Sequence, residues 1–362
     1  MKSLARIVFL KAVALIIAGL SAGCFRPDPA EDLRKAEEAF AKDDLVTAAV
    51  AYQDFIDRYP DHYRLHHVHF RLAQSFFFRN QFIPAIQEFT YVIEHYPGTP
   101  QSTESHWGLA QAYENMGDYE KAEATYRHLH EILDPTDEEG RWQAAFNLGH
   151  VLRLQKRFQE ARLLFLQCAA SDTAAPKYVQ SHMAHAQCFI DQHEWASATA
   201  AMESILKEDI GEDGRLNVGL FMASQNIENK RPEFSLVWLD RIIAISPCLP
   251  ASLRAHIDKG NVLRELDRVP EAIENYRKAT ERYKACMGDR TDDYGLHMHI
   301  ALIEAYCHLE DIEKAERELD RFRARFPEYE FTNRLEQRIR EWEAFYAEQK
   351  AASPTAEKGG KS

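Results

Sequence analysis

An alanine that returns about every 37 residues constrains this chain more than any other feature of its sequence. The recurring positions are 37, 37, 39, 37, 37, 37 and 43 residues apart, and we call them the anchor column: Ala48, Ala85, Ala122, Ala161, Ala198, Ser235, Ala272 and Ala315. A large apolar side chain follows each anchor by four residues and forms the large column: Tyr52, Phe89, Tyr126, Phe165, Met202, Leu239, Tyr276 and Leu319. Twelve residues before the anchor stands the small column, in which only the last member is bulky: Ala36, Ala73, Ala110, Gly149, Ala186, Ala223, Gly260 and Ile303. Three columns kept in register through eight copies indicate an array of similar units.

The stretch Trp107–Pro135 shows what one unit is. Leu109, Ala110 and Tyr113 recur at helical spacing, and after Gly117 a second apolar stripe begins at Ala122. Gly117 ends the first helix and the aspartate after it can cap the second. Small residues at two columns let the paired helices approach closely, and the large column fills the space beside them. A pair of short helices cannot bury its apolar faces alone, so neighbouring pairs must stack.

These residues resemble the tetratricopeptide repeat (TPR) family, in which a Leu-Gly and a Tyr in the first helix precede an Ala, an aromatic residue and a Pro in the second. Prolines fall near the end of five units: Pro60, Pro97, Pro135, Pro247 and Pro327. The resemblance covers Glu31 to Pro327 and is best in Leu72–Pro97, Leu109–Pro135 and Leu148–Phe165. Two departures are the spacing of mostly 37 rather than 34 residues and Trp107, one residue later than the family tryptophan. The resemblance implies an all-α, right-handed superhelical solenoid of about eight stacked antiparallel helix pairs over residues 31–331.

The two ends of the chain differ from the repeats. Residues 332–350 predict a C-terminal capping helix, because a terminal repeat needs a polar outer face. Residues 351–362 are small, polar and Gly-rich, and we expect them to be disordered.

Residues 1–23 predict an export signal. Lys2 and Arg6 precede an apolar run from Ile7 to Leu20, and Ser21-Ala22-Gly23 is a small-residue cleavage site. The cysteine that follows, Cys24, resembles the lipidated cysteine of bacterial lipoproteins, although Ser21 replaces the usual leucine of their lipobox. The alternative is an ordinary signal peptide with an incidental cysteine.

Lipidation of Cys24 would place the repeats at a membrane facing the bacterial periplasm. Residues 24–30 form a tether that reaches about 20 Å when extended, which holds the first repeat near the bilayer. In the lipoprotein family an aspartate after the cysteine favours the inner membrane. Phe25 stands there instead, so the resemblance favours the outer membrane.

The charge of the chain excludes two classes of partner. Its net charge is −13, and loss of the three cations in residues 1–23 makes it −16. An acidic surface opposes binding to nucleic acid and to anionic lipid headgroups.

No catalytic or cofactor motif occurs in the sequence. It lacks a Gly-rich phosphate loop, a nucleophile elbow and an HExxH helix, so we expect neither an enzyme nor a cofactor. One alternative is a metal site formed by His182, His185 and Cys188, which share a helix at three-residue spacing. Other histidines are expected at the surface or in the groove: His66, His67, His69, His297 and His299.

Five cysteines remain after Cys24, and buried thiols are the preferred interpretation. A disulfide between Cys168 and Cys188 is the alternative, since they lie on helices expected to pack together.

The residue after each small-column position is polar in every unit, which a core column would not be. We call these residues the polar column: Glu37, Gln74, Gln111, His150, Gln187, Ser224, Asn261 and Glu304. Carboxamides at such positions can bond the backbone of an extended peptide. Large apolar groups and two arginines accompany them and could anchor a partner, although Phe77 and Phe146 could instead be core residues. The predicted protein-binding groove, on the concave surface lined by the first helix of each pair, comprises Phe70, Gln74, Phe77, Trp107, Gln111, Phe146, His150, Arg153, Met183, Gln187, Asn261 and Arg264.

These features together predict a lipid-anchored periplasmic scaffold that binds a protein partner in its groove. The tether and the Arg-Tyr-Pro (58–60) and His-Tyr-Pro (95–97) repeat ends distantly resemble the lipoprotein subunit of the machinery that assembles outer-membrane β-barrels. That subunit has fewer repeats, and lipoproteins of cell-wall synthesis or pilus assembly remain alternatives. A different class of function is an adaptor or regulator of a periplasmic enzyme, or a metal-binding protein that uses the His182, His185 and Cys188 cluster.

Overall fold

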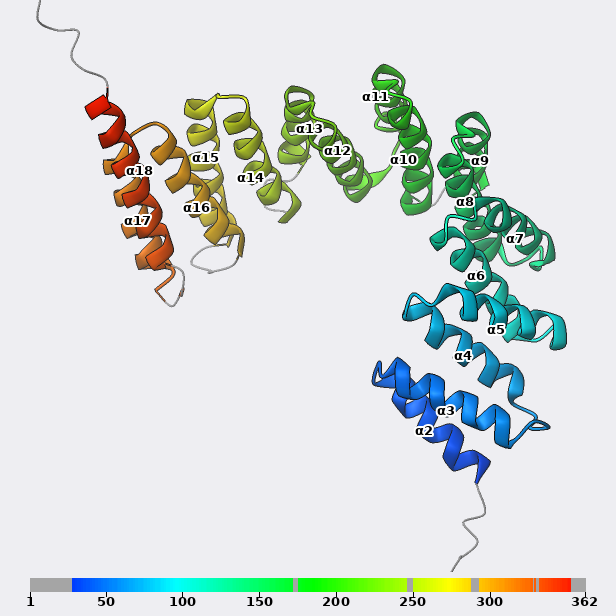
Figure 1. Cartoon of the computed structure of the whole chain (residues 1–362). Helices are drawn as coiled ribbons and strands as arrows, with labels where there is room; N and C mark the ends of the chain where they lie inside the picture. Colours follow the sequence, from blue (N-terminus) through cyan, green and yellow to red (C-terminus); the bar gives the residue numbers. More distant parts are fainter. Residues whose placement is uncertain are drawn as a thin grey trace, which may run out of the picture. The chain divides into compact units, whose positions relative to one another are not determined.

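The computed structural model describes residues 28–171, 175–245, 250–287, 293–327, 329 and 332–352, and within these residues every regular element is an α-helix. The leader, Cys24 and the C-terminal tail after residue 352 lie outside them. The helices follow one another as antiparallel pairs (Figure 1).

The first four pairs are α2 (Pro29–Ala41) with α3 (Leu45–Arg58), α4 (Leu65–Phe78) with α5 (Phe82–His95), α6 (Pro100–Asn115) with α7 (Tyr119–Ile132), and α8 (Glu138–Leu154) with α9 (Phe158–Ser171). The next four are α10 (Ala175–Asp191) with α11 (Trp195–Ile205), α12 (Gly211–Glu228) with α13 (Pro232–Ile245), α14 (Pro250–Glu265) with α15 (Val269–Met287), and α16 (Asp293–His308) with α17 (Ile312–Arg325). The last helix, α18 (Thr332–Ala352), packs on α16 and α17. The predicted class, all-α stacked helix pairs, is confirmed.

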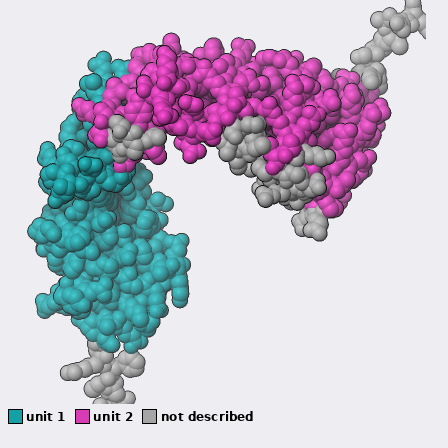
Figure 2. Space-filling view, turned by 180° about the vertical axis from the view of Figure 1, so that it is seen from behind, with its two compact units in different colours: residues 1–165 teal, residues 166–362 magenta. Residues whose placement is uncertain are grey.

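The helices form two compact units, residues 1–165 and 166–362 (Figure 2). Each unit has its own buried apolar interior. In unit 1, Leu33, Tyr52 and Phe55 belong to one cluster and Phe89 to the next. In unit 2, α10 to α14 share one cluster, and α14 to α18 share a second that includes Ile339 of α18.

The three sequence columns form the centre of every pair. All eight anchor residues are fully buried, and every member of the large and small columns is buried as well. The small column keeps the paired helices close: a Cβ atom built on Gly260 would lie 2.0 Å from the Tyr276 ring. Since that ring comes from the large column of the same pair, the two columns are complementary in volume.

A repeated turn joins the two helices of each pair. In the first pair, the Asp43 N–H donates to the Phe40 carbonyl and the Asp44 N–H donates to the Ala39 carbonyl, both at 3.0 Å. This is the Schellman arrangement, and it needs a left-handed residue, here Asp43 at φ 60°. The left-handed position lies five residues before the anchor in all eight pairs: Asp43, Asn80, Gly117, Lys156, His193, Lys230, Asp267 and Glu310. Gly117 was predicted from the sequence, whereas the other seven carry side chains and gave no such signal.

Replacement of Gly260 by alanine tests the close approach of the paired helices. Helix propensity alone would make this change stabilising by about 1 kcal/mol. Because the added methyl group has no room beside Tyr276, we expect a loss of about 1–3 kcal/mol in the free energy of unfolding, measured by urea denaturation. Glu265→Ala, at an exposed position of the same helix, is the control and should change stability by less than about 0.5 kcal/mol. A more stable Gly260→Ala protein would contradict the packing described here.

Candidate protein-binding face

The polar column lies on the first helix of each pair, directly beside the buried small column. None of its eight members is buried, whereas the residue before each of them is. We call the side of each unit that carries this column the first-helix face. In unit 1 it is formed by α2, α4, α6 and α8, and in unit 2 by α10, α12, α14 and α16.

Ionic contacts join α2 and α4 on this face. The Glu37 carboxylate lies 2.7 Å from Nε2 of His67 and 3.6 Å from Nε of Arg71. Arg71 also donates to Oε1 of Gln74 at 3.0 Å and lies 4.8 Å from the centroid of the Phe40 ring. Burial alone would raise the pKa of Glu37, but the hydrogen bond and charge of His67, with the charge of Arg71, outweigh it and lower the pKa. Glu37 is therefore ionised at neutral pH and holds the arginine in place.

A second network joins α6 and α8. The Tyr126 hydroxyl donates to Glu114 at 3.2 Å, and Glu114 lies 3.6 Å from His150. His150 in turn lies 3.2 Å from the guanidinium of Arg153. Burial and the neighbouring Glu114 carboxylate raise the pKa of Tyr126, so its hydroxyl remains a donor. His150 and Arg153, both predicted groove residues, are thus held together.

Gln74 and Gln111 retain hydrogen-bonding capacity between these two networks. Gln111 is exposed, and within the described residues its carboxamide bonds to no other side chain. Gln74 accepts from Arg71 through Oε1, while its amide nitrogen bonds to no other described residue. These two amides can donate to a ligand without breaking an internal bond.

The predicted aromatic anchors pack against their own repeats. Three of them, Phe70, Trp107 and Phe146, stand fifteen residues before an anchor and meet the large column. The ring centroids of Phe70 and Phe89 are 6.1 Å apart, and those of Trp107 and Tyr126 are 6.2 Å apart. Phe146 lies 5.3 Å from Phe165.

Their degrees of burial separate core residues from surface residues. Phe70 is buried, so its predicted place among groove contacts is wrong: it belongs to the core. Trp107, Phe146 and Met183 are half-buried and keep one edge at the surface. Phe77 is also half-buried and packs against Phe78 and Phe82, with both centroid distances 5.7 Å.

In unit 2 the predicted residues mostly make internal bonds. The Gln187 amide donates to Asp191 at 2.8 Å, and Asn261 accepts from the Tyr276 hydroxyl at 2.8 Å. Arg264 pairs with Glu304 at 3.0 Å. Asn261 and Arg264 line a pocket of about 660 Å³ with His308 of the next first helix.

The histidines follow a column of their own, sixteen residues before the anchor: His69, His106, His182, His256 and His299. Three of them meet a polar side chain that follows the anchor by three residues. His69 pairs with Glu88 at 2.7 Å, His256 with Asn275 at 3.0 Å, and His299 with Glu318 at 2.6 Å. The expectation that His69 and His299 lie at the surface is wrong, since both are buried. Their shared spacing was visible in the sequence and could have identified them as packing residues.

The predicted alternative of a metal site has no support in this geometry. The ring of His182 packs on Tyr178, that of His185 on Phe189, and the Cys188 thiol donates to the Ala184 carbonyl at 3.5 Å. Among the described residues, no three His, Cys, Asp or Glu side chains are placed to hold a metal ion.

The cysteines divide into two kinds. Cys168, Cys188 and Cys307 are buried thiols, which agrees with the preferred interpretation of the sequence. The alternative, a disulfide between Cys168 and Cys188, is not formed. Burial raises the pKa of the Cys168 thiol to about 11. Cys286 in α15 is disulfide-bonded, and its partner lies outside the described residues. Sequence spacing gave no indication of that bond.

Comparisons with known proteins agree with the repeat structure. The family model described as tetratricopeptide repeat matches residues 102–174. The helix pairs in this part of the chain therefore match tetratricopeptide repeats. A comparison with curated protein sequences found no significant match. Within the described residues, no helix combines the length and apolarity needed to cross a membrane.

Solved structures similar to this chain share little sequence with it. RapI in its apo form is 12% identical, with 71% of this chain and 99% of that chain covered and a TM-score of 0.47. Yeast Tom70 is 14% identical, with 91% of this chain and 66% of Tom70 covered and a TM-score of 0.44. A tetratricopeptide repeat protein from Parabacteroides merdae is 12% identical, with 86% of this chain and 98% of that chain covered and a TM-score of 0.38.

The buried histidines predict that acid destabilises the fold. Burial lowers the pKa of His256 and outweighs the hydrogen bond to Asn275, which raises it. The cations of Arg282 and Lys259 lower the pKa further, and Asp240 has a small opposite effect. A folded-state pKa below the unfolded value of about 6.5 means that the stabilising contribution is present above pH 6.5 and is lost as pH falls. We therefore expect the unfolding free energy of unit 2 to fall between about pH 7 and pH 5.

His256→Gln should make that decline shallower, because glutamine keeps a polar group beside Asn275 without titrating. Urea unfolding of both proteins at several pH values measures the two slopes. Equal slopes would show that His256 contributes nothing to the pH dependence.

Proposed function

We propose that this protein is a scaffold that holds an extended segment of a protein partner along the first-helix face of unit 1. One observation carries the proposal: Gln74 and Gln111 present amide donors that no other described residue uses, next to the half-buried edge of Trp107. An amide ladder recognises a peptide backbone independently of its sequence, and an aromatic edge supplies an apolar contact. The networks around Glu37 and Glu114 fix the neighbouring side chains, which lowers the entropy lost on binding.

Acidic substitutions at the two glutamines test the proposal. Gln74→Glu together with Gln111→Glu replaces amide donors by carboxylates that only accept hydrogen bonds and that repel backbone carbonyls. For a partner identified by crosslinking in intact cells, we expect the dissociation constant to rise at least about tenfold while helicity by circular dichroism is unchanged.

The matched control is Gln87→Glu with Gln159→Glu. These residues are exposed on the second helices α5 and α9, and the change in charge is the same. The control should bind the partner as the wild type does. If both double variants bind like the wild type, the partner does not use the first-helix face of unit 1.

We further propose that the scaffold is anchored by a lipid on Cys24 and faces the periplasm, more often at the outer than at the inner membrane. The charged start, the apolar run and the Ser21–Cys24 cleavage site support export and lipidation. The disulfide of Cys286 also supports export, because such bonds persist in oxidising compartments. Envelope or outer-membrane assembly is the process that fits such an anchor. An adaptor or regulator of a periplasmic enzyme is the second candidate function, and the same free amides would serve it.

Cys24→Ala tests the anchor directly. Without the thiol no lipid can be attached, so we expect the variant to leave the membrane fraction and appear in the soluble fraction after a salt wash. Cys307→Ala, which removes a buried thiol of unit 2, is the control and should remain with the membranes. A Cys24→Ala protein that stays membrane-bound after high salt would refute lipid anchoring.

A further inference from the structure

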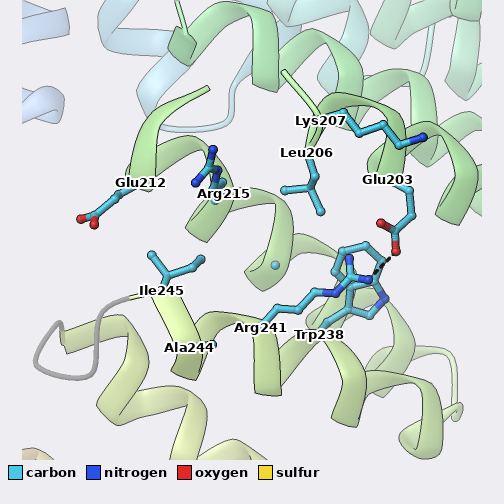
Figure 3. Close-up of a pocket in the computed structure, with 10 residues that line it drawn as sticks. Glu203, Leu206, Lys207, Glu212, Arg215, Trp238, Arg241, Ala244 and Ile245 are labelled. Atoms are coloured by element: carbon cyan, nitrogen blue, oxygen red, sulfur yellow. Dashed lines mark ion pairs between the residues drawn. The ribbon is translucent and has the colours of Figure 1, made fainter. Parts of the chain in front are cut away.

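A pocket of about 590 Å³ lies within unit 2, away from the polar column. It is an open pocket lined by the end of α11, the first turns of α12 and the second half of α13 (Figure 3). On α12 the lining residues are Glu212, Arg215 and Gly219, and helical spacing places Ser224 on a different face of that helix. Its volume is within the range of small-molecule sites in proteins.

Two departures from the repeat pattern surround this pocket. The second helices α3, α5, α7, α9, α13 and α17 have 14 residues each, whereas α11 has only 11 and ends at Ile205. Leu206 and Lys207 therefore leave the helix and line the pocket instead of continuing its last turn.

The second departure is Gly219, which occupies the histidine column. A Cβ atom there would lie 2.6 Å from Cγ1 of Ile242, so the glycine lets α13 approach α12 closely. Trp238 stands at the position that carries Glu88, Asn275 or Glu318 in the histidine pairs. In this repeat the histidine–polar pair is thus replaced by a glycine and a tryptophan, which leaves an apolar wall.

That wall is rigid and apolar. Trp238 is only 4% exposed, and Leu206, Ala244 and Ile245 extend the apolar lining. The guanidinium of Arg241 lies 4.6 Å from the centroid of a Trp238 ring and pairs with Glu203 at 2.6 Å. These contacts fix Arg241 at one end of the pocket, where its charge is neutralised by the glutamate.

Two further cations lie at the rim of the pocket. Lys207 and Arg215 form no ion pair or hydrogen bond through their side chains with any described residue, although both line the pocket. Glu212 is the remaining acid of the lining, and Figure 3 shows its carboxylate directed away from Arg215. Both side chains are exposed at the rim, beside the apolar wall.

We propose that this pocket binds a small apolar carboxylic acid, with its carboxylate on Arg215 at the cationic rim and its apolar body against Trp238, Leu206 and Ile245. Burial of the apolar body supplies the driving force. A charge-assisted contact to the guanidinium, together with the positive charge that Lys207 adds to the rim, selects the acid over a neutral molecule of the same shape. The site does not depend on the scaffold function of unit 1, because all of its residues belong to unit 2.

Calorimetric titration of the purified protein with 2-naphthoate tests the site, with 2-naphthylmethanol as a neutral probe of similar shape. The wild type should bind 2-naphthoate more tightly than the alcohol. Lys207→Gln with Arg215→Gln should raise the dissociation constant for 2-naphthoate about tenfold or more and leave that for the alcohol unchanged. Ala244→Trp, which fills the pocket from an exposed position, should abolish binding of both probes.

Arg277→Gln with Lys278→Gln is the matched control, since it removes two exposed cations from α15 in the same unit. This variant should bind 2-naphthoate as the wild type does. The proposal is overturned if the wild type binds no 2-naphthoate at millimolar concentration or if the alcohol binds as tightly as the acid. It is also overturned if the two double variants have the same dissociation constant for 2-naphthoate.

Discussion

Close packing of a small residue on the first helix against a large side chain on the second is the constraint on which this structure depends. Gly260 faces Tyr276 in this way, and Ala110 accompanies Tyr126. The buried column cannot vary without a change of volume in its partner, and packed interiors tolerate such changes poorly. The residue that follows the small column is free of that constraint. Binding side chains can therefore be exchanged at Gln74 or Gln111 without disturbing the stack.

The residues that fix the stack could be predicted because they recur. Ala122 and Tyr126 were assigned to the core from their register alone, and every equivalent position is buried. The same argument applied to the histidines would have placed His299 against Glu318, since both keep the register of His69 and Glu88. Phe70 was wrongly predicted to lie in the groove. A side chain on this part of the helix can point either towards Phe89 or towards solvent, and its position in the sequence does not show which.

Other features could not be predicted from the sequence, for identifiable physical reasons. The left-handed turn residue is glycine only at Gly117, while Lys156 and Glu310 adopt the same conformation because the Schellman hydrogen bonds require it. The disulfide of Cys286 depends on a distance in space that sequence separation does not encode. The networks that immobilise His150 and Arg153 likewise depend on contacts between neighbouring repeats.

Function in this chain is expected where the repeat leaves freedom or departs from its own pattern. The amides of Gln74 and Gln111 illustrate the first case, because the stack leaves both at the surface and no described side chain bonds the Gln111 carboxamide. The pocket beside Trp238 illustrates the second, since a short α11 and Gly219 interrupt the pattern at one place. The two sites use different chemistry: one presents neutral hydrogen-bond donors, and the other presents cations next to an apolar wall.

The central claim is that a partner protein lies on the first-helix face of unit 1. Site-specific photo-crosslinking in intact cells tests it most directly, with the photoreactive residue placed at Gln111 or, separately, at Gln159 on the second helix α9. The account predicts one dominant crosslinked protein from position 111 and none from position 159. Capture of the same protein from position 159 but not from position 111 would contradict the account.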